Sequence, residues 1–219
     1  GNFDPAELRE EDPWIVAVKS CRLPPKTPTI VGLAHHAWFD IKKGDERSWR
    51  RLEIITTKAF TDDYVYSPRR ISGANARART RWTRDVFLHQ VVTGDEAKRI
   101  ALFLEAAGKE YEDSSNYRGW AGPNSNTFVD RLGRACDGLR FELHHNCVGK
   151  DYTPIVRAGL TTTGMGVELE TYLFGFKLGL EEGIEFHFLN LTFGIDLFPP
   201  ALKLPFAPRL GFQETTFFR

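Results

Sequence analysis

The chain has 219 residues, of which 42% are hydrophobic and 26% charged, and its 29 basic side chains balance 29 acidic ones. This length and composition predict a globular chain of one domain, or of one domain with an appended module. A formal net charge of zero argues against an attraction of the whole protein to nucleic acid or anionic membranes, so we expect no nucleic-acid partner.

The three cysteines, Cys21, Cys136 and Cys147, lack the spacing of a disulfide framework or a zinc site, so we expect no metal or other cofactor. One disulfide or three free thiols both remain open. No apolar run approaches the roughly 18–20 residues of a transmembrane helix, and the chain does not open on a signal peptide. The opening residues are typical of a processed end, so membrane proximity would come from a segment absent from this chain.

Strand-like segments come first. Residues 14–20 predict a short strand, and a proline-rich break at residues 24–28 follows it. Residues 29–41 are rich in β-formers, and a turn at residues 43–45 leads to a returning strand at residues 49–57. His35 and His36 therefore lie in one strand of a predicted hairpin, with Glu53 in the other.

An arginine-rich segment comes next, in which Arg77, Arg79 and Arg81 share one face if the backbone is extended. Two interpretations are open. Charge runs usually form a solvent-exposed face. Alternatively, Arg79 and Arg81 bind an anion beside a site, in a wall that Arg69, Arg70 and Arg84 extend.

A first helix is predicted to begin near Thr93, because Thr93 and Glu96 have the spacing of a capping box. Apolar residues then recur at helical spacing and predict one buried stripe. Its members are Ile100, Phe103, Leu104, Ala107 and Tyr111.

A second helix is predicted after Pro123, which suits a helix entry. The side chains of residues 124–127 all favour helix N-termini. Ser125 lies three residues before Phe128 and seven before Leu132, so it is expected to point toward the packed face.

Two roles for Ser125 are open. Its hydroxyl either caps the helix or acts as a nucleophile whose oxyanion the helix dipole and free amides stabilise. A nucleophilic serine needs a base. His35 and His36 point to opposite faces of their strand, so at most one of them enters the site, and Glu53 is placed to orient its ring. Trp38, Trp120, Asn124 and Asn126 are then candidate binding residues of the cleft.

The order of a histidine strand, an acidic strand and a helix opened by a nucleophile resembles the circularly permuted papain-like superfamily, which includes lecithin retinol acyltransferase-like proteins. Those proteins have Asn-Cys-x-x-Phe at the helix start, whereas this chain has Asn-Ser-Asn-Thr-Phe at residues 124–128. The resemblance implies an α+β core over residues 14–160, an antiparallel sheet packed on helices, with His36 as the base. A hydroxyl needs concerted proton removal, which triads achieve. A serine in place of the catalytic cysteine is also what a catalytically inactive binding domain would contain.

The chain more closely resembles a bacterial domain family of unknown function. The shared segments are His36-Ala-Trp38, Tyr117 to Phe128, Val148-Gly-Lys-Asp-Tyr, Thr163-Gly-Met-Gly-Val, Gly179-Leu-Glu-Glu-Gly-Ile-Glu and Pro200-Ala-Leu-Lys-Leu-Pro, and the likeness covers nearly all of the chain after about Trp14. It implies no particular activity. Members often carry an N-terminal hydrophobic segment, which implies the periplasm or cell envelope.

Residues 161–219 predict a different module, in which apolar residues alternate with polar ones and the parity switches near bends. We expect a β-meander of about four strands and then an extended, proline-rich tail. Two interpretations are open: the meander covers the core, or it presents an apolar face to lipid, an acyl chain or a partner.

Two functions follow. The first is a hydrolase or acyltransferase, with Ser125 as nucleophile, His36 as base and Glu53 as the orienting group, acting on an amide or ester of a small molecule, peptide or lipid. The second is a catalytically inactive binding or scaffold domain of the cell envelope. A hydrogen bond from Ser125 Oγ to a His36 ring nitrogen, with Glu53 on the other nitrogen, is what the first requires.

Overall fold

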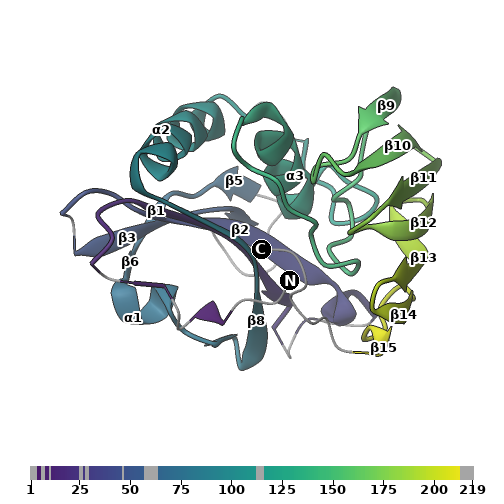
Figure 1. Cartoon of the computed structure of the whole chain (residues 1–219), viewed down its shortest axis with the longest axis horizontal. Coiled ribbons are helices and arrows are strands. Elements are labelled where there is room, and N and C mark those ends of the chain that lie inside the picture. Colours follow the sequence, from purple (N-terminus) through teal and green to yellow (C-terminus); the bar gives the residue numbers. More distant parts are fainter. Residues whose placement is uncertain are drawn as a thin grey trace.

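Two large antiparallel sheets and two longer helices form most of the computed structural model, which describes residues 4–5, 8–9, 11–24, 27, 30–45, 47–56, 64–111 and 116–212. The helices lie over one side of the first sheet, and the second sheet stands beside one of them (Figure 1). Among the helices of the described residues, none combines the length and apolar character needed to span a membrane.

The first sheet has six strands in the order β6-β3-β2-β1-β8-β7. In chain order these are β1 (Ile15–Arg22), β2 (His35–Lys42), β3 (Ser48–Leu52), β6 (Arg69–Ser72), β7 (Thr80–Arg81) and β8 (Arg84–Thr93). Two short strands, β4 (Ile54–Thr56) and β5 (Tyr64–Tyr66), pair separately.

The predicted hairpin is confirmed in part as β2 and β3, which pair from Phe39 with Leu52 to Lys42 with Trp49. Its returning strand ends at Leu52, so Glu53 lies between β3 and β4 and not within the strand predicted for residues 49–57. Its first strand begins later than predicted, because residues 30–33 form a 3-10 turn, η2 (Ile30–Leu33). Residues 28 and 29 lie outside the described residues.

Two helices cover one face of this sheet. They are α2 (Gly94–Lys109) and α3 (Ser125–Ala135), close to the predicted positions. Ile100 and Leu104 of α2 and Phe128 of α3 pack with Phe39 of β2 in the main core. Thr93 is the N-cap of α2, but its side chain makes no capping hydrogen bond, so the predicted capping box does not form.

The arginine-rich segment is not the extended strand that its alternation suggested. A short helix, α1 (Gly73–Ala76), occupies the preceding residues, with the Ser72 side chain as its N-cap and Arg77 as its C-cap. Because the chain turns there, the arginines do not share a face. Arg79 is exposed and bonds Asp4, whereas Arg81 is largely buried and bonds Glu53.

The second sheet is a seven-stranded meander. Its strands are β9 (Val156–Leu160), β10 (Gly166–Thr171), β11 (Phe174–Gly179), β12 (Gly183–Phe188), β13 (Leu191–Leu197), β14 (Pro200–Lys203) and β15 (Leu210–Gly211). The meander therefore begins before the predicted start at residue 161. It also draws in part of the predicted tail, where Pro200 opens a strand at a position that proline tolerates.

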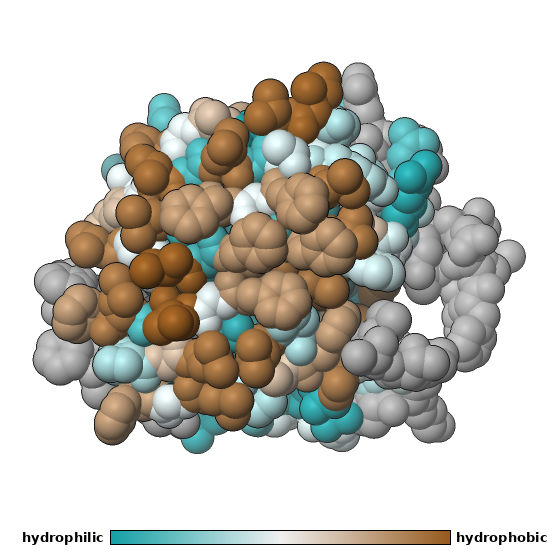
Figure 2. Space-filling view, turned by 90° about the vertical axis from the view of Figure 1, so that its right-hand side faces the viewer, coloured by the Kyte–Doolittle hydropathy of each residue, from teal (hydrophilic) through white to brown (hydrophobic). Residues whose placement is uncertain are grey.

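The charged face of the meander is buried and its apolar face is exposed. Paired positions across neighbouring strands place Glu168 beside Lys177 and Lys177 beside Glu185, and all three are at most 5% exposed. On the opposite face, Phe176 and Phe186 are 45% and 47% exposed, and apolar side chains gather across the surface in Figure 2. The meander contacts the core through paired charges, such as Arg134 of α3 with Glu168, while its apolar face stays exposed, so features of both interpretations are present.

Candidate functional site

Three predicted residues form one hydrogen-bonded chain. The Oγ atom of Ser125, the first residue of α3, lies 2.9 Å from Nδ1 of His36 on β2. His36 Nε2 lies 2.7 Å from Oε2 of Glu53, the residue between β3 and β4. All three side chains are buried, with Ser125 4% exposed. His35 points elsewhere and stacks on His144, with 4.0 Å between the ring centroids.

Asn124, and not Ser125, caps α3. The Asn124 side chain accepts the backbone N–H groups of Asn126 and Thr127, and the Thr127 hydroxyl accepts the N–H of Asn124 in a complete capping box. The capping interpretation of Ser125 is therefore wrong, since its hydroxyl contacts His36.

Asn126 fixes α3 to the strand that carries His36. Strand β3 pairs with β2 only from Phe39 onward, which leaves an open edge at residues 35–37. Asn126 Oδ1 accepts the N–H of Ala37, and its Nδ2 donates to the carbonyl of His35, both at 2.9 Å. The Asn124 amide likewise donates to backbone carbonyls, those of Gly119 and Val148. Both predicted binding asparagines are buried and hold the protein's own backbone.

Two arginines hold Glu53 in its ionised form. Arg69 bonds Oε1, and Arg81 approaches both oxygens, at 2.9 and 3.1 Å. Burial opposes ionisation of Glu53, but its bonds to His36 and Arg81 outweigh that effect and lower its pKa. An ionised carboxylate only accepts hydrogen bonds, so we assign the proton of His36 to Nε2.

His36 is therefore a neutral base directed at Ser125. Burial lowers the pKa of His36, and the interaction with Glu53 only partly offsets this. With its proton on Nε2, Nδ1 is left to accept the Ser125 hydroxyl proton. This is the protonation state that a general base requires.

The start of α3 offers fewer free amides than the sequence suggested. The N–H groups of Asn126 and Thr127 donate to Asn124. The N–H of Ser125 makes no hydrogen bond to the described residues, and it is the one amide among these three that is left for an oxyanion. The helix dipole adds a favourable potential there.

The two predicted tryptophans lie in different places. Trp38 is fully buried, and its Nε1 donates to Asp40 at 3.0 Å. Trp120 is 57% exposed and donates to the carbonyl of Leu189 in the turn between β12 and β13. Trp82, which the sequence did not single out, lies nearer to the site, with its ring centroid 5.7 Å from that of His36.

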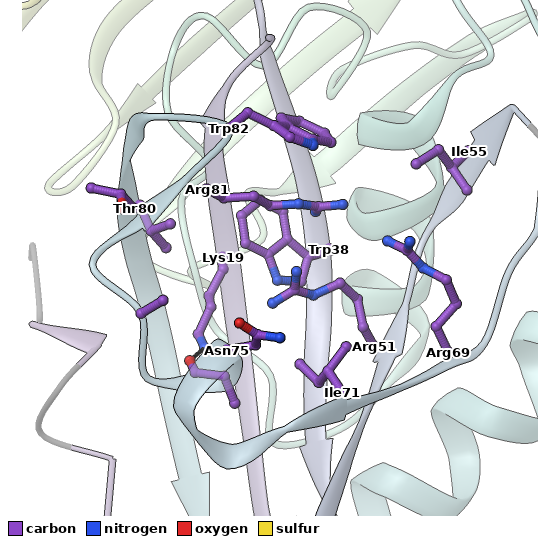
Figure 3. Close-up of a pocket in the computed structure, with 13 residues that line it drawn as sticks. Lys19, Trp38, Arg51, Ile55, Arg69, Ile71, Asn75, Thr80, Arg81 and Trp82 are labelled. Carbon is purple, nitrogen blue, oxygen red and sulfur yellow. Dashed lines mark hydrogen bonds between the residues drawn. The ribbon is translucent and has the colours of Figure 1, made fainter. Parts of the chain in front are cut away.

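A cavity of about 370 Å³ lies beside this constellation. Basic side chains from separate strands surround it, together with Trp38 and Trp82 (Figure 3). The basic residues are Lys19, Arg51, Arg69 and Arg81. Sequence reasoning found Arg69 and Arg81 but missed Lys19 and Arg51. Lys19 and Arg51 could have been found from the alternation of side chains along the strands, which places them on the same face of the sheet as Trp38, Asp40 and His36.

A second polar cluster lies beneath the meander, where ligand atoms of Asp151, Glu170 and His187 come within 4.8 Å of one another. These residues do not fit a metal. Both ring nitrogens of His187 bond carboxylates, and Lys150 and Lys177 already neutralise Asp151. Burial opposes protonation of His187, yet Asp151 and Glu170 raise its pKa to about 9, so its ring carries positive charge itself.

The three cysteines form no disulfide and are buried. Burial raises the pKa of Cys21 and Cys147 to about 12, so both thiols stay protonated at neutral pH.

The profile of the DUF3750 family, described as a protein of unknown function, matches residues 20–152. That range includes His36, Glu53 and Ser125. No curated protein and no solved structure matches the chain.

Proposed function

Because the chain belongs to the DUF3750 family, whose function is unknown, we propose a function from the site itself: a serine-type hydrolase or acyltransferase that acts on an amide or ester bond. The observation that carries this proposal is the continuous chain of hydrogen bonds from Ser125 through His36 to Glu53. Its arrangement of nucleophile, base and orienting carboxylate is that of a catalytic triad.

Ser125 Oγ attacks the carbonyl carbon of the substrate as its proton moves to His36 Nδ1. Glu53 stabilises the resulting imidazolium through Nε2. The carbonyl oxygen becomes an oxyanion near the Ser125 N–H at the helix start. When the intermediate collapses, the leaving amine or alcohol takes the proton from His36, and an acyl-serine remains. Water or a second alcohol or amine then attacks that ester, with His36 again acting as base.

The likeness to the permuted papain-like superfamily supports the same assignment. The order of His36, Glu53 and a helix that opens with Asn124-Ser125 is the order expected for that superfamily, with serine replacing cysteine. A hydroxyl is a weaker acid than a thiol, so the proposal depends on His36 being deprotonated and close. Both conditions hold for a neutral ring at 2.9 Å.

Labelling with a serine-reactive fluorophosphonate tests the proposal, because Oγ forms a bond to phosphorus as fluoride leaves. We expect wild type and Ser20→Ala to react and Ser125→Ala not to react. Ser20 is the matched control, since it is buried and lies 2.9 Å from Nε2 of His89. Equal labelling of wild type and Ser125→Ala, or no labelling of either, would reject a nucleophilic Ser125.

A second function, a catalytically inactive interaction domain, is favoured by the exposed face of the meander. Twelve large apolar side chains on β10–β14 are each at least 39% exposed. At roughly 200 Å² for a large side chain they present about 1,000 Å², more than the largest patch of a typical monomer. The exposed, outward-facing positions of these strands hold apolar side chains. Two copies of the chain can therefore pair through this face without burying an unpaired charge.

Sedimentation analysis tests this second candidate. We expect the wild type to form dimers at micromolar concentration and Phe186→Lys to be monomeric, because the lysine would bury an unpaired charge. A control variant, Lys98→Glu on the exposed side of α2, keeps the dimer. A monomeric wild type, or a Phe186→Lys dimer of equal affinity, would contradict pairing through this face.

A further inference from the structure

The cavity beside the site draws its walls from all six strands of the first sheet, and its basic side chains and Trp38 come from five of them. Lys19 comes from β1, Trp38 from β2, Arg51 from β3, Arg69 from β6 and Arg81 from β7. In Figure 3 the guanidinium groups of Arg51 and Arg81 lie against the indole of Trp38, and that of Arg69 points toward them from one side. Asn75 of α1 reaches the same space.

Positive charge around the cavity exceeds negative charge. Asp40 is shared by Lys19, at 3.0 Å, and Arg51, at 2.7 Å. Glu53 is shared in the same way by Arg69 and Arg81. Four cations thus meet two carboxylates, and no acidic residue lines the cavity itself in the described part of the chain.

Buried excess charge is costly unless a counter-charge arrives. The side chains of Lys19, Arg51 and Arg81 are 1%, 8% and 10% exposed. Burial lowers the pKa of Lys19, its pairing with Asp40 only partly offsets this, and the charge of Arg51 lowers it further. An anion that enters the cavity would compensate this charge.

Donor groups remain for such an anion. Arg51 bonds Asp40 through Nε and Nη2, which leaves Nη1 without a hydrogen bond to the described residues. The Nε of Arg81 likewise makes no hydrogen bond to the described residues, since Nη1 and Nη2 are the atoms that bond Glu53. Arginine edges suit the paired oxygens of a carboxylate or phosphate.

Aromatic rings hold the arginines in place. The guanidinium carbon of Arg81 lies 4.6 Å from the centroid of the Trp38 ring and 4.0 Å from that of Trp82. Arg51 lies 4.8 Å from Trp38. Stacking fixes the guanidinium planes and leaves their edges to donate.

We propose that this cavity binds a small molecule through a carboxylate or phosphate group, with Arg51, Arg69 and Arg81 donating to its oxygens and Trp82 covering it. A cavity of about 370 Å³ is of the size that holds small ligands. The rings of Trp38 and Trp82 also lie 6.0 and 5.7 Å from that of His36, so the bound group sits next to the site. This binding does not rest on Ser125 being a nucleophile.

Titration calorimetry with inorganic phosphate and with succinate, at constant ionic strength, tests the proposal. Binding of phosphate alone assigns a phosphate ligand, and binding of succinate alone assigns a carboxylate. The Ser125→Ala variant should bind as tightly as wild type, which separates this test from that of catalysis.

Neighbouring residues of one strand provide the matched variants. Arg69 and Arg70 are both exposed on β6, but only Arg69 lines the cavity. We expect Arg69→Gln to weaken binding about tenfold, as loss of one charge-assisted hydrogen bond does, and Arg70→Gln to leave it unchanged. Asn75→Asp, which adds a carboxylate to the cavity wall, should weaken binding as well.

The absence of binding by either anion at about 10 mM would overturn the proposal, because charge-assisted pairs in a preformed cavity should exceed that affinity. Equal losses in Arg69→Gln and Arg70→Gln would overturn it too, since they would indicate general charge attraction.

Discussion

At the scale of single residues, the protonation of His36 decides what Ser125 does. His36 donates its Nε2 proton to the Glu53 carboxylate, so the lone pair of Nδ1 faces the Ser125 hydroxyl. Burial keeps the pKa of His36 below its ordinary value. The base is thus already in its active form at neutral pH.

The rate of fluorophosphonate labelling should therefore be flat around neutral pH. A group with a lowered pKa loses its base form only below the ordinary histidine value of about 6.5, so the rate should fall only in more acidic solution. Stopped samples analysed by intact mass give the rate at each pH. A rate that still rises between pH 7 and 8 would contradict a neutral His36.

Asn126 is a positioning residue, and its removal should cost stability. Asn126→Ala loses its side-chain hydrogen bonds to Ala37, His35 and Val148 and leaves buried backbone groups unpaired. We expect the free energy of unfolding to fall by about 2–4 kcal/mol in urea titrations. The control Asn75→Ala, an exposed residue with no side-chain bond to the described residues, should change it by less than about 0.5 kcal/mol. Similar losses in the two variants would refute this role.

At the scale of elements, the meander is held by paired charges. Lys177 lies 2.5 Å from Asp151 and 3.8 Å from Glu168, and neighbouring strands place Glu185 opposite it. Burial opposes the charge on Lys177, but Asp151 raises its pKa above the ordinary value. These charges satisfy one another away from water, which is why the apolar positions face outward.

Removing one member of this network should lower the free energy of unfolding strongly. Lys177→Met leaves Asp151 and Glu168 with less compensation, and we expect a loss of about 3–5 kcal/mol in the free energy of unfolding. Its neighbour Phe176 points to the opposite, exposed face, so Phe176→Thr should cost far less. Urea unfolding of both variants compares the faces directly. A larger loss in Phe176→Thr would mean that the apolar face, and not the charged one, stabilises the sheet.

At the scale of the whole molecule, three strands of the first sheet and both of its covering helices could be predicted from the sequence, whereas β6 and β8 were not. Helix stripes and the β2–β3 hairpin follow from local periodicity, and both are observed. The grouping of Ser125 with His36 came from resemblance and not from spacing. Local propensity alone could not choose between Asn124 and Ser125 as the cap, because both side chains favour that position.

Other features depend on contacts between distant segments. Alternation predicted the strands of the meander, but it does not tell which side is buried, and a charged side can be buried when its members pair. The roles of Arg51 and Trp82 arise only when β3 and the β7–β8 turn come together around one cavity. Asn126 can bond the backbone of β2 at His35 and Ala37 because β3 does not pair with that part of the strand.

The central claim is that Ser125 is a nucleophile activated by His36. Peptide mass spectrometry of the fluorophosphonate-treated wild type tests it most directly, because cleavage after Arg118 and Arg131 releases a peptide whose one serine is Ser125. We predict the phosphonyl adduct on Ser125 of that peptide. An adduct on another residue, or an unmodified peptide after full exposure to the reagent, would contradict it.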